Sequence, residues 1–259
     1  MTPRIAIGNL KGGTGKTTLT TNIGACLAHK GVRVLLIDAD PQGSASEMFF
    51  RGDDFPPEEH TLAALYNEKP LQRYADIIHR TRIEELDIVP ASEVLALAAV
   101  SISELDRAPW RIADFLNEVD GVYDLVILDT HPDLGIFTLG ALLAAQHILV
   151  PLQPERPAVT GFARFWETLS LIAEASPVDL LGIICSQLDE RGKSHKEWHQ
   201  QMIESFADRY IGYIHRATAV NEASDLGLTL REHNTNTRAC REFVAISKAV
   251  AGRVGITVR

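Results

Sequence analysis

Cysteine is scarce in this sequence, and the few cysteines form no pattern. Cys26, Cys185 and Cys240 are far apart, and none of them lies in a Cys-x-x-Cys pair or at a Cys/His ligand spacing. Disulfide frameworks need an even number of cysteines, and zinc sites need closely spaced ligands. We therefore expect buried, reduced thiols, which are typical of a cytoplasmic protein.

Long apolar runs are also missing. A helix needs about 20 consecutive apolar residues to cross a bilayer, and the longest candidate, residues 134–151, contains Gln146 and His147. That stretch fits a helix followed by a strand. The residues before Ile5 contain no apolar segment of the kind found in secretion signals. These absences predict a cytoplasmic protein that makes no use of a membrane.

Basic charge is in the minority, with 25 Lys and Arg against 34 Asp and Glu, for a net charge of −9. This balance excludes a protein coated with basic charge for permanent nucleic-acid binding. The acid excess lies early in the chain, because residues 189–259 carry 11 basic and 9 acidic side chains and the remainder carries 14 and 25. A local basic patch near the C-terminus is therefore compatible with the sequence.

The 259 residues have ordinary globular composition, 46% hydrophobic and 23% charged, and no Gly/Ser/Pro-rich linker divides them. We expect a single domain over residues 1–259. Short apolar runs alternate with helix-length segments, which predicts an α/β fold with a mostly parallel, twisted β-sheet flanked by helices on both faces. The predicted strands cover residues 5–7, 32–37, 86–89, 125–128, 148–152, 181–185 and 210–214, and the clearest helices cover 17–30, 160–175 and 196–209.

A glycine-rich segment between the first predicted strand and helix is interpreted as a phosphate-binding loop of the G-x-x-x-x-G-K-T kind. Glycines let successive backbone N–H groups face a polyphosphate, and the helix N-terminus adds partial positive charge. We expect Lys16 to reach the β- and γ-phosphates and the Thr17 hydroxyl to bind Mg²⁺. The predicted nucleotide contacts in this loop are Lys11, Gly12, Gly13, Thr14, Gly15, Lys16, Thr17 and Thr18.

Lys11 allows two interpretations from its chemistry alone. A lysine in an exposed loop is normally a solvated charge. This one precedes Gly12 and Gly13 at the mouth of an anion site, which makes an extra phosphate contact equally compatible.

Three aspartates follow predicted strands. Asp38 and Asp40 come after residues 32–37, and Asp129 comes after residues 125–128. Because active sites of parallel sheets lie at the carboxyl ends of strands, these side chains are expected near the phosphate loop. Asp-x-Asp-Pro is also good turn chemistry, and a lone Asp can cap a helix. Acids beside a phosphate loop favour the functional interpretation.

These segments resemble the ParA/MinD group of P-loop ATPases. The similarity extends over nearly the whole chain, although its C-terminal part is loose. The matching segments are Lys11–Thr18 (deviant Walker A motif), Asp38–Gly43, Val126–Thr130 (Walker B strand), Ile148–Gln153, Ile214–Arg216 (an I-P-R segment) and Val220–Ala223.

Two histidines depart from the family pattern. His131 stands after Asp129-Thr130, where the family usually has a small residue or proline. It either touches the γ-phosphate side of the site or is an ordinary surface histidine. His215 replaces the proline of the I-P-R segment, so the contact with adenine is left open.

The resemblance implies catalytic roles for three residues. Lys11 would be the signature lysine that reaches the nucleotide of a partner subunit, so that ATP holds a homodimer together. Lys16 would neutralise the phosphates, and Asp40 would orient or activate the attacking water. The expected reaction is slow, Mg²⁺-dependent hydrolysis of ATP to ADP and phosphate.

The resemblance also implies how ATP and Mg²⁺ are held. Thr17 would bind the metal directly. Asp38 would hold a metal-bound water or support the switch loop, and Asp129 would act on the metal through water. Arg216, in the I-P-R-like segment, would contact the nucleotide.

Proteins of this group partition plasmids, chromosomes or mobile elements, and the resemblance therefore implies non-specific DNA binding by the ATP-bound dimer. It also implies a centromere-binding or cargo-adaptor partner that stimulates hydrolysis, and association with the nucleoid in the ATP state. The alternative for the basic residues is an ordinary solvated helix face. The candidate DNA contacts are Arg216, Arg231, Arg238, Arg241 and Lys248.

Three alternative functions make different demands on the sequence. A positioning ATPase for a protein cargo would use the same residues with another adaptor. A MinD-like membrane ATPase needs a C-terminal amphipathic helix, and Gly252 and Gly255 disfavour a helix over residues 251–259. A metabolic relative, such as a nitrogenase-reductase-like protein or an amidoligase, needs cysteine placements that we do not find.

Overall fold

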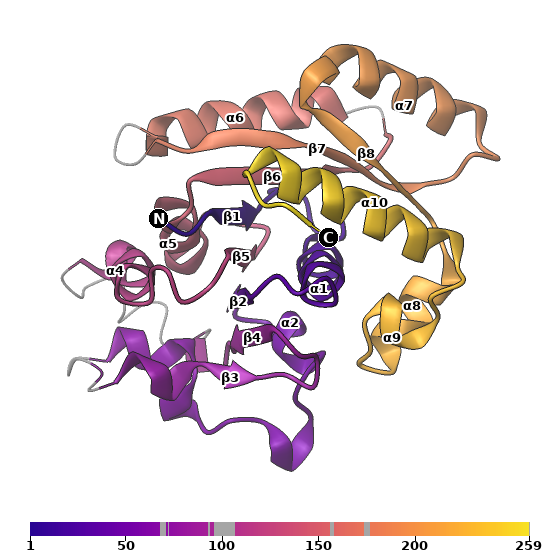
Figure 1. The fold of residues 1–259 in the computed structure, drawn as a ribbon. Helices are drawn as coiled ribbons and strands as arrows, with labels where there is room; N and C mark the ends of the chain where they lie inside the picture. Colours follow the sequence, from indigo (N-terminus) through magenta and orange to yellow (C-terminus); the bar gives the residue numbers. More distant parts are fainter. Residues whose placement is uncertain are drawn as a thin grey trace.

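Strands of the described residues form one eight-stranded sheet in the order β3-β4-β2-β5-β1-β6-β7-β8 (Figure 1). The computed structural model describes residues 1–67, 71, 73–92, 94–95, 107–155, 158–173 and 177–258. Every neighbouring pair is parallel except β3–β4. The strands are β1 Arg4–Ile7, β2 Val34–Ala39, β3 His79–Arg80, β4 Leu86–Val89, β5 Leu125–Thr130, β6 His147–Leu152, β7 Asp179–Leu188 and β8 Tyr210–His215.

The central strands are apolar throughout because both faces of the sheet are covered. In β1, Ile5 and Ile7 pack into one cluster of buried side chains and Ala6 into the other. Leu35 and Leu36 of β2 divide in the same way. Alternate residues therefore serve two hydrophobic layers, which is why these strands read as continuous apolar runs rather than alternating ones.

Helices cover both faces of the sheet. α1 packs with α10 on one face, whereas α4, α5, α6 and α7 lie on the other (Figure 1). The predicted fold class is therefore confirmed. The helices are α1 Lys16–Ala28, α2 Ser44–Glu47, α4 Arg111–Glu118, α5 Ile136–Ala144, α6 Ala158–Ala173, α7 Lys193–Phe206, α8 Thr218–Asp225, α9 Leu230–His233 and α10 Arg238–Arg253.

Element boundaries differ from the prediction by a few residues. β2 begins at Val34 and continues through Asp38 to Ala39, whereas the predicted strand was 32–37. β7 extends past Cys185 to Leu188, and the helix expected at 196–209 begins at Lys193 and ends at Phe206. Residues 174–175 of the predicted helix 160–175 lie outside the described residues. The extensions of β2 and β7 matter, because both add residues to the candidate nucleotide-binding site.

The expectation that glycine prevents a helix near residue 251 was wrong in part. α10 runs through Gly252 and ends at Arg253, and Gly255 then takes a left-handed φ of 80°. Phe243 and Val250 bury the inner face of α10, and this packing offsets the cost of one glycine, about 1 kcal/mol. No helix among the described residues is both long and apolar enough to cross a membrane.

Candidate nucleotide-binding site

The carboxyl ends of β1, β2 and β5 meet near the middle of the sheet. Ile7, the last residue of β1, pairs with Asp129 of β5, and Asp129 also pairs with Asp38 of β2. The loop after β1 and the three predicted aspartates therefore lie at one edge of the sheet, as parallel topology requires.

The loop between β1 and α1 is built to receive an anion. Gly13 and Gly15 take left-handed φ values of 71° and 88°, which side-chain-bearing residues adopt at a cost. The backbone N–H groups of residues 12–18 have no hydrogen-bond acceptor within the part of the chain that the structure describes. Such a row of free donors at a helix N-terminus is an anion site.

The match to the general phosphate-loop pattern is incomplete at its start. Five positions before Gly15 the chain carries Leu10, where G-x-x-x-x-G-K-T requires glycine. The side chain of Asn9 fixes this turn by two hydrogen bonds. Its Nδ2 donates to the Pro151 carbonyl (2.7 Å), and its Oδ1 accepts from the Lys11 N–H (3.0 Å). The functional part of the loop therefore begins at Lys11.

Lys16 is the buried cation of the loop. Its side chain is only 7% exposed, and Nζ donates to the Asn9 carbonyl at 3.2 Å. Burial lowers the pKa of Lys16, and the carboxylates of Asp129, Asp40 and Asp133 oppose that shift. A phosphate at this position would compensate a charge that burial otherwise penalises.

Lys11 lies in an arrangement that neither sequence interpretation anticipated. Its Nζ contacts the Glu155 carboxylate at 2.5 Å and donates to Gln153 Oε1 at 2.9 Å. Both ion-pair partners are about half exposed, 48% and 46%. Exposed pairs of this kind contribute about 0.2–1 kcal/mol, so Lys11 can leave Glu155 at little cost.

Asp38 and Asp129 are fully buried side by side. Asp38 accepts hydrogen bonds from the Ser46 N–H (2.8 Å) and hydroxyl (2.6 Å), and Asp129 accepts one from Thr20 (3.1 Å). Burial raises the pKa of both carboxyls, and the charge of Asp38 raises the pKa of Asp129 further. Two buried acids held together in this way are suited to share a cation.

The donor set fits Mg²⁺ held mainly by ligands other than protein. Asp129 Oδ2 is buried without a hydrogen-bond partner among the described residues, and the Thr17 hydroxyl lies close enough to lower the pKa of Asp129 by hydrogen bonding. The described residues contain no cluster of three or more His, Cys, Asp or Glu side chains able to enclose a metal. Mg²⁺ typically keeps waters and substrate phosphates as ligands, and Thr17, Asp38 and Asp129 suit that mode.

Asp40 lines a polar cavity next to the phosphate loop. It is 7% exposed, and Oδ1 accepts the N–H of Gln42 at 2.9 Å. His131 lies between two acids, with Nδ1 3.0 Å from Asp133 and Nε2 3.9 Å from Asp40. His131 is therefore neither free in solvent nor in direct hydrogen-bond contact with Asp40.

Two adjoining cavities continue from the loop. A polar cavity of about 330 Å³ is lined by loop residues 13–18 together with Asp40 and Ser44. The other, about 320 Å³, lies beyond Thr18 and is lined by Ser186, His215 and Arg216. Both include Gly15, Thr18, Gln187 and Val220. Their shared walls suit a molecule with an anionic tail and a larger organic head.

Sequence reasoning missed three residues that line the second cavity: Ser186, Gln187 and Arg191. The predicted strand 181–185 stopped just before Ser186 and Gln187, whereas β7 continues to Leu188, and Arg191 follows a few residues later. The polar pair Ser186-Gln187 inside an apolar run was the available signal, because polar residues in a buried strand usually have a partner or a function.

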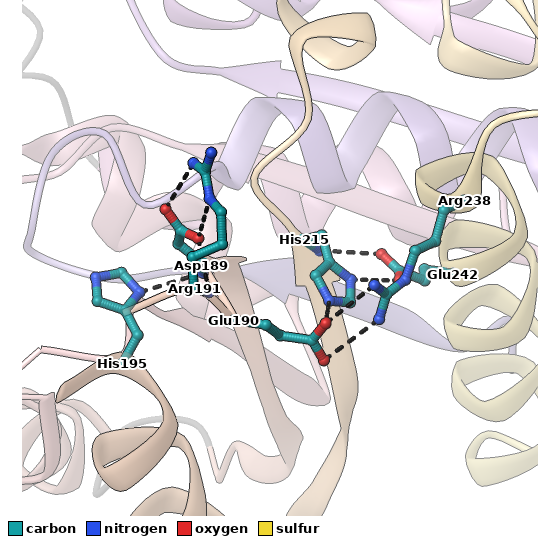
Figure 2. A network of polar contacts seen from close by, with 7 residues as sticks. All are labelled: Asp189, Glu190, Arg191, His195, His215, Arg238 and Glu242. Carbon is teal, nitrogen blue, oxygen red and sulfur yellow. Dashed lines mark hydrogen bonds and ion pairs between the residues drawn. The ribbon is translucent and has the colours of Figure 1, made fainter. Parts of the chain in front are cut away.

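His215 lies in a four-residue ionic network (Figure 2). Its ring contacts Glu242 through Nδ1 and lies 3.0 Å from Glu190 through Nε2, while Arg238 binds the same two carboxylates at 3.0 Å each. Hydrogen bonds from Arg238 and His215 lower the pKa of Glu190 to about 2. His215 therefore joins β8 to α10, which the expected proline could not do.

The candidate DNA contacts differ in how available their charges are. Arg216, Arg241 and Lys248 are exposed, and Arg231 is partly buried. Arg238 is exposed as well, but its guanidinium is bound to two carboxylates. Arg241 and Lys248 share one face of α10 with the exposed residues 245 and 252. Arg238, Arg241 and Lys248 all belong to α10, and one of these three charges is neutralised.

The anion cradle lies at the first strand–helix connection of a parallel sheet, which is the arrangement of the P-loop nucleotide hydrolases. Comparison with known proteins agrees. Residues 2–180 match the AAA domain family. The chain is 33% identical to the sporulation initiation inhibitor protein Soj of Bacillus subtilis over 95% of this chain and 97% of Soj, and 31% identical to the chromosome partitioning protein ParA of Myxococcus xanthus over 96% and 88%. This chain belongs to the ParA/Soj family of P-loop ATPases.

Solved structures are similar over the whole chain. Cobyrinic acid a,c-diamide synthase from Mycobacterium smegmatis, with a bound ATP analogue and magnesium, superposes with a TM-score of 0.80 at 27% identity, covering 98% of this chain and 96% of the other. The ATP complex of Cyanothece McdA gives 0.83 at 20% identity, covering 100% and 98%. At that identity the second similarity shows the fold alone.

Proposed function

We propose that this chain is an ATP-dependent, dimerising ATPase that partitions or positions DNA. The observation that carries the proposal is the row of free N–H groups at residues 12–18, with Lys16 at its centre and the Asp38–Asp129 pair beneath it. The single-domain organisation over residues 1–259 remains part of this proposal.

Each residue of the site has a part in hydrolysis. Phosphoryl transfer needs positioning and charge neutralisation more than covalent help, and Lys16 with the loop N–H groups supplies both. Asp40, at the cavity wall, orients the attacking water. Bound Mg²⁺ would neutralise phosphate charge, with Thr17 as its direct ligand and Asp38 and Asp129 behind its waters. Arg216 contacts the nucleotide in the second cavity.

Dimerisation through Lys11 is part of this proposal. Its ammonium lies at the mouth of the site, and Leu10 and Leu134, 36% and 37% exposed, add apolar surface on the adjoining loops. In the ATP-bound dimer Lys11 exchanges Glu155 for a phosphate of the partner's nucleotide. The basal rate is slow, and DNA with an adaptor protein raises it.

DNA binding is assigned to Arg216, Arg231, Arg241 and Lys248, with a smaller share from Arg238. A dimer presents this patch twice, which strengthens a weak site. The ATP-bound form would then be found on the nucleoid. The neutralisation of Arg238 favours a second candidate, a positioning ATPase for a protein cargo. Membrane binding through α10 is disfavoured because its apolar face is buried against α1.

Replacement of Lys16 tests the site assignment. We expect Lys16→Ala to weaken MgATP binding at least about tenfold and to abolish turnover, because a charged hydrogen bond contributes about 1.5–3 kcal/mol. Titration calorimetry and a phosphate-release assay measure the two effects. Lys196→Ala, on the exposed surface of α7, is the matched control. If Lys16→Ala binds and hydrolyses MgATP like the parent, the assignment is wrong.

A further inference from the structure

Two glutamine side chains converge on one backbone oxygen of the phosphate loop. The Gly13 carbonyl accepts from Gln153 Nε2 at 3.0 Å and from Gln187 Nε2 at 2.7 Å. Gln153 directly follows β6, and Gln187 belongs to β7. The loop is thus held from two neighbouring strands that are more than 130 residues away in sequence, at separations of 140 and 174.

The amide of Gln153 is oriented from both ends. Its Oε1 accepts from the Lys11 ammonium at 2.9 Å, and an ammonium can only donate. Its NH₂ group must therefore face the Gly13 carbonyl, which can only accept. One side chain consequently connects the lysine at the mouth of the site with the backbone of the loop.

Gln187 reaches the loop from an unusual backbone conformation. Its φ is 54°, in the left-handed region, and the register of β7 against β8 is irregular between Cys185 and Leu188. For a residue other than glycine this region is energetically unfavourable. Backbone strain of this kind persists where the surrounding structure requires it, and it concentrates at functional sites.

The contact with Gly13 determines the direction of the next N–H group. In a planar trans peptide the carbonyl of one residue and the N–H of the following residue point in opposite directions. Because the glutamines hold the Gly13 oxygen on their side, the Thr14 N–H faces away from them. That N–H has no acceptor among the described residues, and Gly13 and Thr14 both line the polar cavity.

We propose that Gln153 and Gln187 are positioning residues that aim the Thr14 N–H at the polyphosphate. The inference rests on the proposed function, since it requires a nucleotide in this cavity. Gly13 itself is exposed, so water can satisfy its carbonyl when a glutamine is removed. The two side chains therefore contribute to phosphate binding and not to the stability of the fold.

Gln187→Met tests the proposal most cleanly, because methionine has nearly the same length and no donor. Loss of one hydrogen bond, about 0.5–1.5 kcal/mol, predicts MgADP affinity about 2- to 12-fold weaker and a raised KM for MgATP with kcat at saturation retained. Magnesium pyrophosphate should lose the same factor, whereas adenosine, which has no phosphate to meet the Thr14 N–H, should lose clearly less. Gln201→Met, on the exposed side of α7, is the matched control for calorimetry and thermal unfolding.

Gln187→Gly separates the hydrogen bond from the backbone strain. Glycine relieves the strain at φ 54° but removes the donor, so we expect the same loss of MgADP affinity with an unchanged or higher unfolding temperature. If either variant binds MgADP and pyrophosphate like the parent, the positioning role is wrong while the nucleotide site stands. An equal loss for adenosine would also contradict it. If the parent chain itself binds no MgADP, the proposed function fails together with this inference.

Discussion

Asp38 and Asp129 lie side by side on neighbouring strands, and burial raises the pKa of both carboxyls. A carboxyl whose pKa is raised by folding favours the folded state only while it is protonated. The stabilisation is present below its unfolded pKa and is lost as the pH rises towards the folded value. The buried pair is therefore expected to lower the stability of the nucleotide-free protein at neutral pH.

Replacement of Asp129 by asparagine should reveal this cost. Asparagine carries no charge to desolvate, so we expect Asp129→Asn to raise the free energy of unfolding at pH 8 by about 1–3 kcal/mol. The gain should shrink steadily as the pH falls towards about 3.9, the pKa of an unfolded aspartate, because below it the carboxyl is protonated in both states. Urea unfolding of the nucleotide-free protein across this range measures it. The same variant should lose Mg²⁺-dependent ATP hydrolysis. An equal or lower stability at pH 8 would contradict the account.

The positions of single residues were predictable only in part. The aspartates could be placed from the sequence because parallel strands deliver their carboxyl ends to one edge of the sheet. The ion pairs of Lys11 with Glu155 and of Arg238 with Glu190 could not, since each joins segments that only the folded chain brings together. Counting charges along the sequence located the basic region, but it could not show that two carboxylates neutralise Arg238.

Among the helices, α10 has one buried apolar face and one exposed basic face. Phe243, Ile246 and Val250 pack into the core, and Arg241 and Lys248 face outwards. The basic residues of α10 were candidate DNA contacts from the sequence, but the bounds of the helix were not predicted. Gly252 and Gly255 were expected to disfavour a helix over residues 251–259, and packing against α1 nevertheless carries α10 through Gly252 to Arg253. The end of β7 was missed for a related reason, because the left-handed Gln187 leaves no signature in composition.

The outer face of α10 is predicted to bind DNA. If Arg241 and Lys248 contact phosphates, the double variant Arg241→Ala/Lys248→Ala should weaken DNA binding and reduce the slope of log affinity against log salt. Each lost phosphate contact lowers that slope by about 0.9, so a dimer should lose about 2–4 units. Arg238→Ala should have a smaller effect.

Filter binding or fluorescence anisotropy at several salt concentrations measures these slopes. Lys193→Ala/Lys196→Ala, which removes two exposed charges from α7, is the matched control. A double α10 variant that binds with the slope of the parent would move the DNA surface elsewhere.

For the whole molecule, the sheet order explains why one site combines so many distant segments. β1 lies at the centre between β5 and β6, so its loop meets Asp129 on one side and Gln153 on the other. The net charge of −9 keeps a single chain from binding DNA strongly. In the proposed function a weak patch becomes effective only when it is doubled, and Lys11 would let ATP double it by pairing two chains.

In the proposed function, ATP binding controls DNA binding by pairing two chains. A titration of non-specific duplex DNA with the parent protein, in the presence of ATP, of ADP and of no nucleotide, repeated across salt concentrations, tests it most directly. The account predicts binding in ATP alone, with a steep loss of affinity as salt rises. Equal binding in all three conditions, or binding in none of them, would contradict it.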